Sequence, residues 1–63
     1  MTARENLNRI MAEKKVKNRE FAKLVGMTEM KTCNIRKGVN TFHADYIPRF
    51  SEALGVEMEE FFK

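Results

Sequence analysis

The sequence has little of what secreted and membrane proteins require. It contains one cysteine, so no disulfide can form within the chain, and a reducing, cytosolic compartment fits best. No apolar run approaches the roughly 18 residues that a membrane span needs. The charged start of the chain also lacks the apolar segment of a signal peptide. We therefore expect a cytoplasmic protein with no membrane partner.

Groups that could catalyse a reaction or bind a metal are also scarce. His43 and Cys33 are the only residues of their types, and neither belongs to a cluster of metal ligands in the sequence. We expect His43 to be a loop hydrogen-bond donor and Cys33 to be half-buried. The chain has no evident nucleophile–base set or carboxylate pair, and 63 residues leave little room for a substrate cleft. We predict no enzyme activity, catalytic residue, metal, cofactor or small-molecule substrate.

The chain does have an uneven distribution of charge along one short domain, residues 1–63. Residues 1–38 contain ten Lys and Arg and four Glu, a net charge of +6. Residues 39–63 contain two Lys and Arg and five Asp and Glu, a net charge of −3. A polyanion that faces the basic half would suit this asymmetry. The alternative interpretation is a solvated surface whose charges are unevenly placed.

Residues 18–38 predict two short helices joined by a tight turn. Asn18 and Thr28 are of the types that cap helix starts. Gly26 and Gly38 are placed to end the helices, because glycine takes left-handed dihedrals without steric cost. The predicted helices span residues 19–25 and 29–37. Helix, short glycine-containing turn and helix form the helix-turn-helix pattern, and in DNA-binding versions the second helix enters the major groove.

The remaining residues predict three more helices and no strand, hence an all-α fold. A helix over 3–14 places its apolar residues at helical spacing. Pro48 would be the third residue of a helix that Asp45 caps, a position where its missing N–H costs nothing. A last short helix is predicted over 57–62. Residues expected to face the core are Leu7, Ile10, Met11, Val16, Phe21, Leu24, Val25, Ile35, Ile47, Phe50, Leu54, Val56, Met58 and Phe61, whereas Phe62 has nothing obvious to cover it.

In the joint spacing of these pieces, the chain resembles the Cro/C1-type (XRE-like) helix-turn-helix family of phage and bacterial transcriptional repressors. The resemblance covers residues 7–62. It is carried by NREFA at 18–22, VGMT at 25–28, Ile35 with Gly38, and SEALGV at 51–56. It implies a compact, five-helix, lambda-repressor-like DNA-binding domain, with the helix-turn-helix at about 18–37. It also implies the cytoplasm of a bacterial or phage-infected cell, in association with the nucleoid.

The resemblance further implies two groups of residues that contact DNA. The outer face of the helix over 29–37 is expected to read bases with Glu29, Met30, Lys31 and Asn34. Residues around the helix-turn-helix and in the loop after it are expected to contact phosphates, namely Lys17, Asn18, Arg19, Thr28, Lys37, Asn40 and Thr41.

The chemistry of the four reading residues suits different bases. Asn34 can form a bidentate pair with adenine, Lys31 can reach guanine or a phosphate, and Met30 can pack on a thymine methyl group. Glu29 can accept a hydrogen bond from cytosine N4. It can equally well complement the positive end of its own helix dipole, and the sequence leaves both readings open.

Two positions depart from the family pattern. The family commonly pairs an Arg on the first helix with a Glu near the end of the third, and Met11 and Arg36 stand there instead. Thr32 occupies a position that is usually Ile or Val. Both departures bear on how the helix over 29–37 is held. We expect Arg36 to be partly exposed or bonded to backbone carbonyls, since a buried, unpaired guanidinium is strongly destabilising.

These features predict a sequence-specific regulator of transcription that binds double-stranded DNA, most simply a Cro/C1-like repressor. One alternative is a protein-interaction module, an antitoxin or anti-repressor, that binds through the Phe61–Phe62 end. Another is the DNA-binding domain of a longer repressor. Since one reading helix covers only a few base pairs, we expect a weak homodimer that forms on a DNA operator through the acidic, aromatic C-terminal third.

Overall fold

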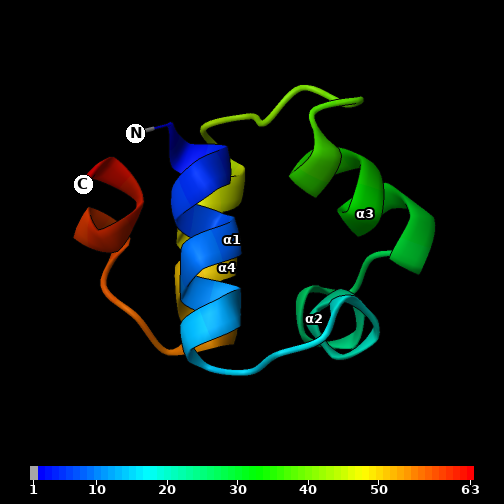
Figure 1. The fold of residues 1–63 in the computed structure, drawn as a ribbon, viewed down its shortest axis with the longest axis horizontal. Coiled ribbons are helices and arrows are strands. Elements are labelled where there is room, and N and C mark those ends of the chain that lie inside the picture. The colour runs from blue at the N-terminus through cyan, green and yellow to red at the C-terminus, as the bar shows by residue number, and fades with distance from the viewer. Residues whose placement is uncertain (1) are drawn as a thin grey trace.

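The computed structural model describes residues 2–63, and this range is helical with no strand. Its elements are α1 (Ala3–Glu13), α2 (Asn18–Val25), α3 (Glu29–Lys37), α4 (Tyr46–Leu54) and the 3-10 helix η1 (Met58–Phe62). In Figure 1, η1 and α3 lie on opposite sides of α1, and both contact it. The all-α prediction is confirmed, but residues 2–63 form four α-helices and a 3-10 turn rather than five helices. No described helix is long and apolar enough to cross a membrane.

Local sequence signals set most helix boundaries. Thr2 and Glu5 form a capping box at the start of α1, and the Thr2 N–H donates to the Glu5 carboxylate at 3.0 Å. Gly26 and Gly55 end α2 and α4 with φ of 71° and 69°, a left-handed conformation in which a Cβ would be strained. Pro48 is the third residue of α4, as predicted.

One predicted cap is wrong and another is confirmed in position only. Asn18 is the first residue of α2 rather than its cap, and Lys17 occupies the cap position without a side-chain hydrogen bond. Asp45 is at the cap position of α4, as predicted, but its side chain makes no capping hydrogen bond and its backbone is already helical. Each helix begins there without the side-chain oxygen that the sequence suggested, so tertiary packing, rather than capping, places these two starts.

The hydrophobic core is formed by one face of each helix. Phe50 of α4 lies at its centre, with its ring centroid 5.0 Å from Phe21, 5.6 Å from Phe42 and 5.2 Å from Tyr46. These contacts join α2, α4 and the loop before α4. The buried core residues are Leu7, Ile10, Met11, Phe21, Val25, Ile35, Ile47, Phe50, Leu54 and Phe61.

Some predicted core residues lie elsewhere. Leu24 is 52% exposed on the outer side of α2, and Met58 is also exposed. Val16 and Val56 are only partly buried at the margin of the core. A helix of eight residues buries one stripe, and Phe21, Ala22 and Val25 already fill the stripe of α2.

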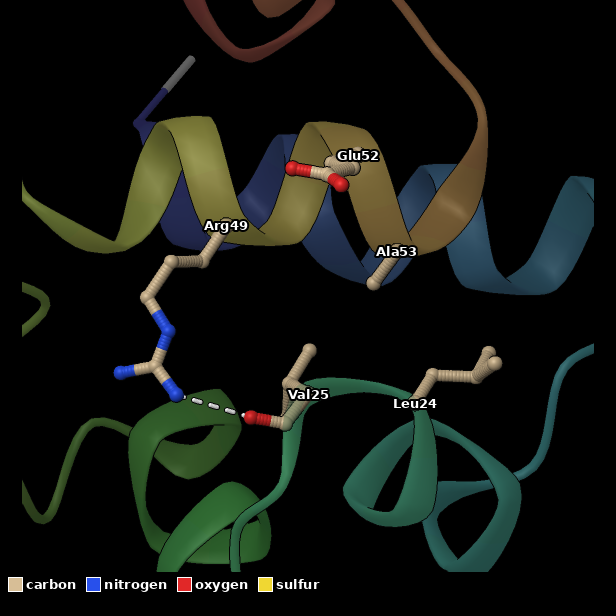
Figure 2. Close-up of a pocket in the computed structure, with 5 residues that line it drawn as sticks. All are labelled: Leu24, Val25, Arg49, Glu52 and Ala53. Carbon is tan, nitrogen blue, oxygen red and sulfur yellow. Dashed lines mark hydrogen bonds between the residues drawn. The ribbon is translucent and has the colours of Figure 1, made fainter.

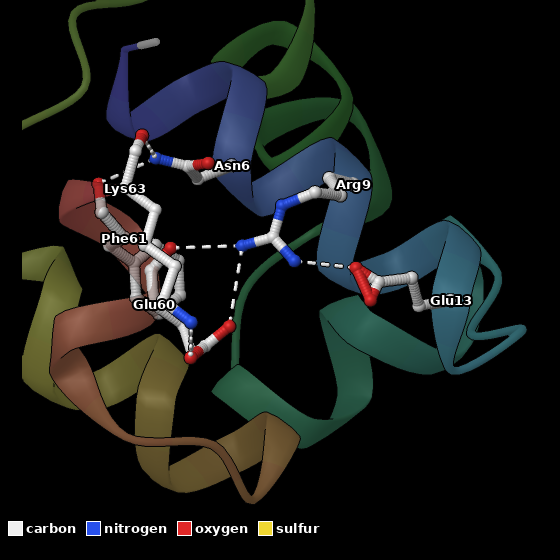
Figure 3. Close-up of polar contacts among 6 residues, drawn as sticks. All are labelled: Asn6, Arg9, Glu13, Glu60, Phe61 and Lys63. Carbon is white, nitrogen blue, oxygen red and sulfur yellow. Dashed lines mark hydrogen bonds and ion pairs between the residues drawn. The ribbon is translucent and has the colours of Figure 1, made fainter.

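The C-terminal turn is fixed to α1 by polar contacts (Figure 3). Asn6 is fully buried, and its Nδ2 donates to the carbonyls of Phe61 at 3.0 Å and Lys63 at 2.9 Å. Arg9 donates to the Glu60 carbonyl at 3.1 Å and pairs with the carboxylate of Glu13. The bonds to Glu60, Phe61 and Lys63 hold η1 against α1, with Phe61 buried in the core.

Candidate nucleic-acid interface

The α2–turn–α3 unit places two helix starts next to each other. Gly26 ends α2, and the Thr28 hydroxyl accepts a hydrogen bond from the Lys31 N–H at 3.1 Å, which confirms Thr28 as the cap of α3. Asn18, at the start of α2, donates from Nδ2 to the Glu29 carbonyl at 2.9 Å. Since backbone N–H groups and positive dipole ends collect at helix starts, this edge suits an anionic partner.

The first turn of α3 is open to solvent. Glu29, Met30 and Lys31 are all exposed, and Met30 has 75% of its surface accessible. Asn34, one turn further along, is half-buried. The four predicted base-reading residues therefore lie on one short helix, three of them fully available. Their contacts with bases stay a prediction.

Most of the predicted phosphate-contacting residues are also accessible. The C-terminal end of α3 orders the start of the following loop, because the Asn34 carbonyl accepts from the N–H groups of Gly38, Val39 and Asn40 at 3.0–3.2 Å. Asn40 is thereby held beside the end of α3. The exposed residues of this set are Lys17, Arg19, Thr28, Lys37, Asn40 and Thr41.

Asn18 differs from the rest of that set because its side chain is used within the protein. Its Oδ1 accepts from the Thr32 hydroxyl at 3.0 Å and from Arg36 Nη1 at 3.4 Å. Thr32 is fully buried, so its hydroxyl needs such a partner. The amide of Asn18 thus joins α2 to α3, and a phosphate contact by this residue stays a prediction.

Arg36 has a partner that the sequence did not suggest. Its Nε donates to Oδ1 of Asn8 at 2.8 Å, and Nδ2 of Asn8 donates back to the Arg36 carbonyl at 3.2 Å. Arg36 is half-buried, so the first of its two expected environments, partial exposure, is the one observed. Its guanidinium donates to two amide side chains and not to backbone carbonyls. A reciprocal Asn–Arg pair between α1 and α3 stands in place of the ion pair.

Arg4 makes a second contact from α1 to the end of α3, and sequence reasoning missed it. Its Nε donates to the Ile35 carbonyl at 3.2 Å, and its guanidinium lies 3.3 Å from where a Cβ on Gly38 would be. Carbonyls in the last turn of a helix have no partner within the helix, so a cation is favourable there. The sequence did contain one signal for these two contacts. Arg4 and Asn8 lie four residues apart, so they share one face of the predicted helix and can contact the same neighbour.

A hollow of about 390 Å³ opens between α2 and α4 (Figure 2). Leu24 and Ala53 supply its apolar walls, and Arg49 crosses it to donate to the Val25 carbonyl at 2.8 Å. This bond gives a partner to a carbonyl at the end of α2 that has none within the helix.

Among residues 2–63, no three potential metal ligands of the His, Cys, Asp and Glu types lie together.

The comparisons with known proteins agree with this geometry. A family model described as a Cro/C1-type HTH DNA-binding domain matches residues 6–63, which is nearly the whole chain. A search of curated proteins and a search of solved structures each return no match.

Proposed function

Because the chain belongs to the Cro/C1-type helix-turn-helix DNA-binding domain family, we propose that it is a sequence-specific transcriptional regulator that acts as a repressor in a bacterial or phage-infected cytoplasm. The first turn of α3 enters the major groove of duplex DNA, and Glu29, Met30, Lys31 and Asn34 contact base edges there. Membership in the family supports DNA binding, and the geometry of α3 supports base reading.

The exposure of Met30 carries the proposal. The Met30 side chain is 75% exposed, the highest value among the large apolar residues, and it belongs to no part of the core. It stands between Glu29 and Lys31 at the positive end of the helix. An apolar group among charged ones suits a groove that offers both thymine methyl groups and hydrogen-bonding base edges.

Backbone contacts would position α3 without carrying sequence information. The exposed residues predicted to contact phosphates are of two kinds. The cationic ones are Lys17, Arg19 and Lys37, and the polar ones are Thr28, Asn40 and Thr41. Asn18 contributes its backbone N–H at the start of α2. The domain is thereby oriented with α3 toward the groove.

Selection of binding sites from a random duplex pool tests the proposal. We expect a short consensus and an affinity that falls steeply with salt, because each neutralised phosphate adds about 0.9 to the log–log slope. Asn34→Ala should relax preference at one position. Arg19→Gln should weaken binding to all sequences alike and lower the slope by about 0.9. A flat salt response would remove the proposal and favour the protein-interaction alternative.

We further propose that two copies assemble weakly on the operator through the C-terminal turn. Phe62 is 71% exposed and Met58 is 49% exposed on η1, whereas Phe61 is buried. Exposed apolar groups on a small domain are typical of interaction surfaces. Helix-turn-helix dimers bind half-sites about one helical turn apart, which adds the affinity that one reading helix lacks.

Binding isotherms on duplexes with one and two selected half-sites test the dimer. Phe62→Ala should reduce cooperative binding to the two-site duplex and leave binding to a single half-site nearly unchanged. Leu24→Ala, at an exposed apolar residue on α2, is the matched control. Equal affinity per half-site in the unmutated protein would exclude assembly on the operator.

A further inference from the structure

The reading helix α3 has little apolar anchoring. Only Thr32 and Ile35 of its nine residues are buried, and Ile35 alone belongs to the hydrophobic core. One apolar side chain fixes a point on a helix but not its direction. A binding site built on that helix needs its groups held within about 0.5 Å and 10–20°. Other contacts must therefore set the orientation of α3.

Directional polar contacts occur at both ends of α3. At the first turn, Asn18 of α2 donates to the Glu29 carbonyl at 2.9 Å and accepts from Thr32 at 3.0 Å. At the last turn, α1 provides the reciprocal bonds between Asn8 and Arg36 at 2.8 and 3.2 Å. Because hydrogen bonds weaken steeply as their angles change, two such sites at the ends of a helix define its direction.

We propose that Asn8 is a positioning residue for DNA recognition. Its amide fixes the last turn of α3 from α1, and thereby sets the direction in which the first turn of α3 meets the bases. This inference rests on the proposed function, because it assumes that α3 reads sequence. Asn8 acts through Arg36 and needs no contact with DNA.

Asparagine is suited to this position because one amide both donates and accepts. Asn8 donates to the Arg36 carbonyl and accepts from the Arg36 side chain at the same time. A carboxylate could accept from the guanidinium but could not donate to the carbonyl. Since Asn8 is uncharged and does not titrate, its pairing with Arg36 should depend weakly on salt and pH.

The test compares the affinity for a duplex selected by the unmutated protein with the affinity for a scrambled duplex, well below the melting temperature. Asn8→Ala should lower this discrimination ratio by about 2- to 30-fold, the range of mutations that act without touching the ligand. Binding to the scrambled duplex and its salt slope should not change, because no charge is removed. Hydrogen exchange at the α3 amides should accelerate while exchange in α4 does not.

Asn6→Ala is the matched control. Asn6 also lies on α1 and also donates to two backbone carbonyls, but these belong to Phe61 and Lys63. Since Asn6 is fully buried, its loss should lower stability at least as much as Asn8→Ala and yet preserve the discrimination ratio. If Asn6→Ala does not fold, Arg9→Gln serves the same purpose, because Arg9 also contacts η1 and its charge affects both duplexes.

Asn8→Asp keeps the acceptor for the Arg36 guanidinium but loses the donor to the Arg36 carbonyl, so it should recover only part of the ratio. An unchanged ratio in Asn8→Ala, or an equal loss in the control, would overturn the inference. If the unmutated protein selects no consensus, the proposed function fails, and exchange at the α3 amides still decides the positioning role. Unchanged exchange there in Asn8→Ala would refute it.

Discussion

The helices α3 and α4 have the same length of nine residues but are held in opposite ways. α4 buries Ile47, Phe50 and Leu54 in the core. α3 contributes Ile35 alone and depends on hydrogen bonds from α1 and α2 for the rest. Apolar burial gives α4 stability without strict direction, whereas hydrogen bonds give α3 direction with little stability.

This difference shows how a small domain can free one helix for a ligand. A 63-residue chain buries only about 60% of the surface of its unfolded form, so every exposed turn weakens a marginal core. The core is concentrated around Phe50 instead, and α3 is oriented by side chains that require little apolar area. Stability and recognition should therefore respond to different substitutions.

The largest expected effect is on the α4 side. Phe50→Ala should lower the free energy of unfolding by about 3–5 kcal/mol, because the residue is fully buried among three aromatic rings. Urea unfolding followed by circular dichroism measures the loss. Leu24→Ala, half exposed on α2, should stay within about 0.5 kcal/mol. Comparable losses for the two variants would show that the core is not centred on α4.

A smaller effect is expected from converting α3 toward apolar anchoring. The buried Thr32 hydroxyl donates to Asn18 and also lies within hydrogen-bond distance of the Thr28 and Glu29 carbonyls. Thr32→Val removes this hydroxyl and should lower the free energy of unfolding by about 1 kcal/mol. Thermal unfolding measures this change. Ser51→Ala in α4 is the control, because that hydroxyl donates only to Pro48 of its own helix at 3.0 Å. A gain in stability for Thr32→Val would mean that polar contacts do not hold α3.

A substitution in the connection between α1 and α2 should raise stability without changing the core around α4 or the hydrogen bonds of α3. Lys15 has φ of 56°, a left-handed conformation that is unfavourable for a residue with a side chain. Lys15→Gly should raise the free energy of unfolding by up to about 1 kcal/mol. Lys14→Gly should lower it, since Lys14 has ordinary right-handed dihedrals. Differential scanning calorimetry measures both changes. Equal effects of the two substitutions would contradict a left-handed conformation at Lys15.

The smallest effect is a loss of stability in acid that is confined to α1 and η1. Hydrogen bonds from Thr2 lower the pKa of Glu5, and the hydrogen bond from Lys63 lowers the pKa of Glu60. Carboxylates whose pKa is lower in the folded protein stabilise it above the ordinary value of about 4.5, and that stabilisation disappears as the pH falls through the lowered pKa. Thermal unfolding between pH 7 and pH 3 should show this decline.

Glu5→Gln should make the decline in stability with falling pH shallower. Glu59→Gln controls for the loss of a charge, because Glu59 makes neither the bond to Thr2 nor the bond to Lys63. Hydrogen exchange should locate the loosening in α1 and η1 before α3. A decline that begins in α3 would contradict the separation of the two regions.

The sequence allowed the helices and their ends to be predicted wherever local chemistry decides them. Gly26, Gly38 and Gly55 end their helices, and Thr28 caps α3, because these effects involve only neighbouring residues. The core face of α4 followed from helical spacing. Leu24 was assigned to the core wrongly, because a helix with apolar residues on two sides does not reveal which side meets its neighbours.

The polar contacts of α3 could not be predicted either, because they depend on which helix faces meet in the fold. Asn8 and Arg36 are 28 residues apart, and only the packing of α1 against α3 brings them together. Asn18 looked like a cap or a phosphate ligand because its local position allowed both. The residues proposed to contact DNA were suggested by family resemblance, and most of them are exposed.

The hydrogen bond from Asn6 to the Lys63 carbonyl brings residue 63 close to the first turn of α1. Thr2 precedes Asn6 by four residues, a rise of about 6 Å along a helix, and Asn6 lies 2.9 Å from the last carbonyl. A short peptide could therefore join residue 63 to residue 2 without moving α1 or η1. Such a cyclised chain would lose conformational freedom chiefly when unfolded, so it should melt at a higher temperature while α3 keeps its orientation.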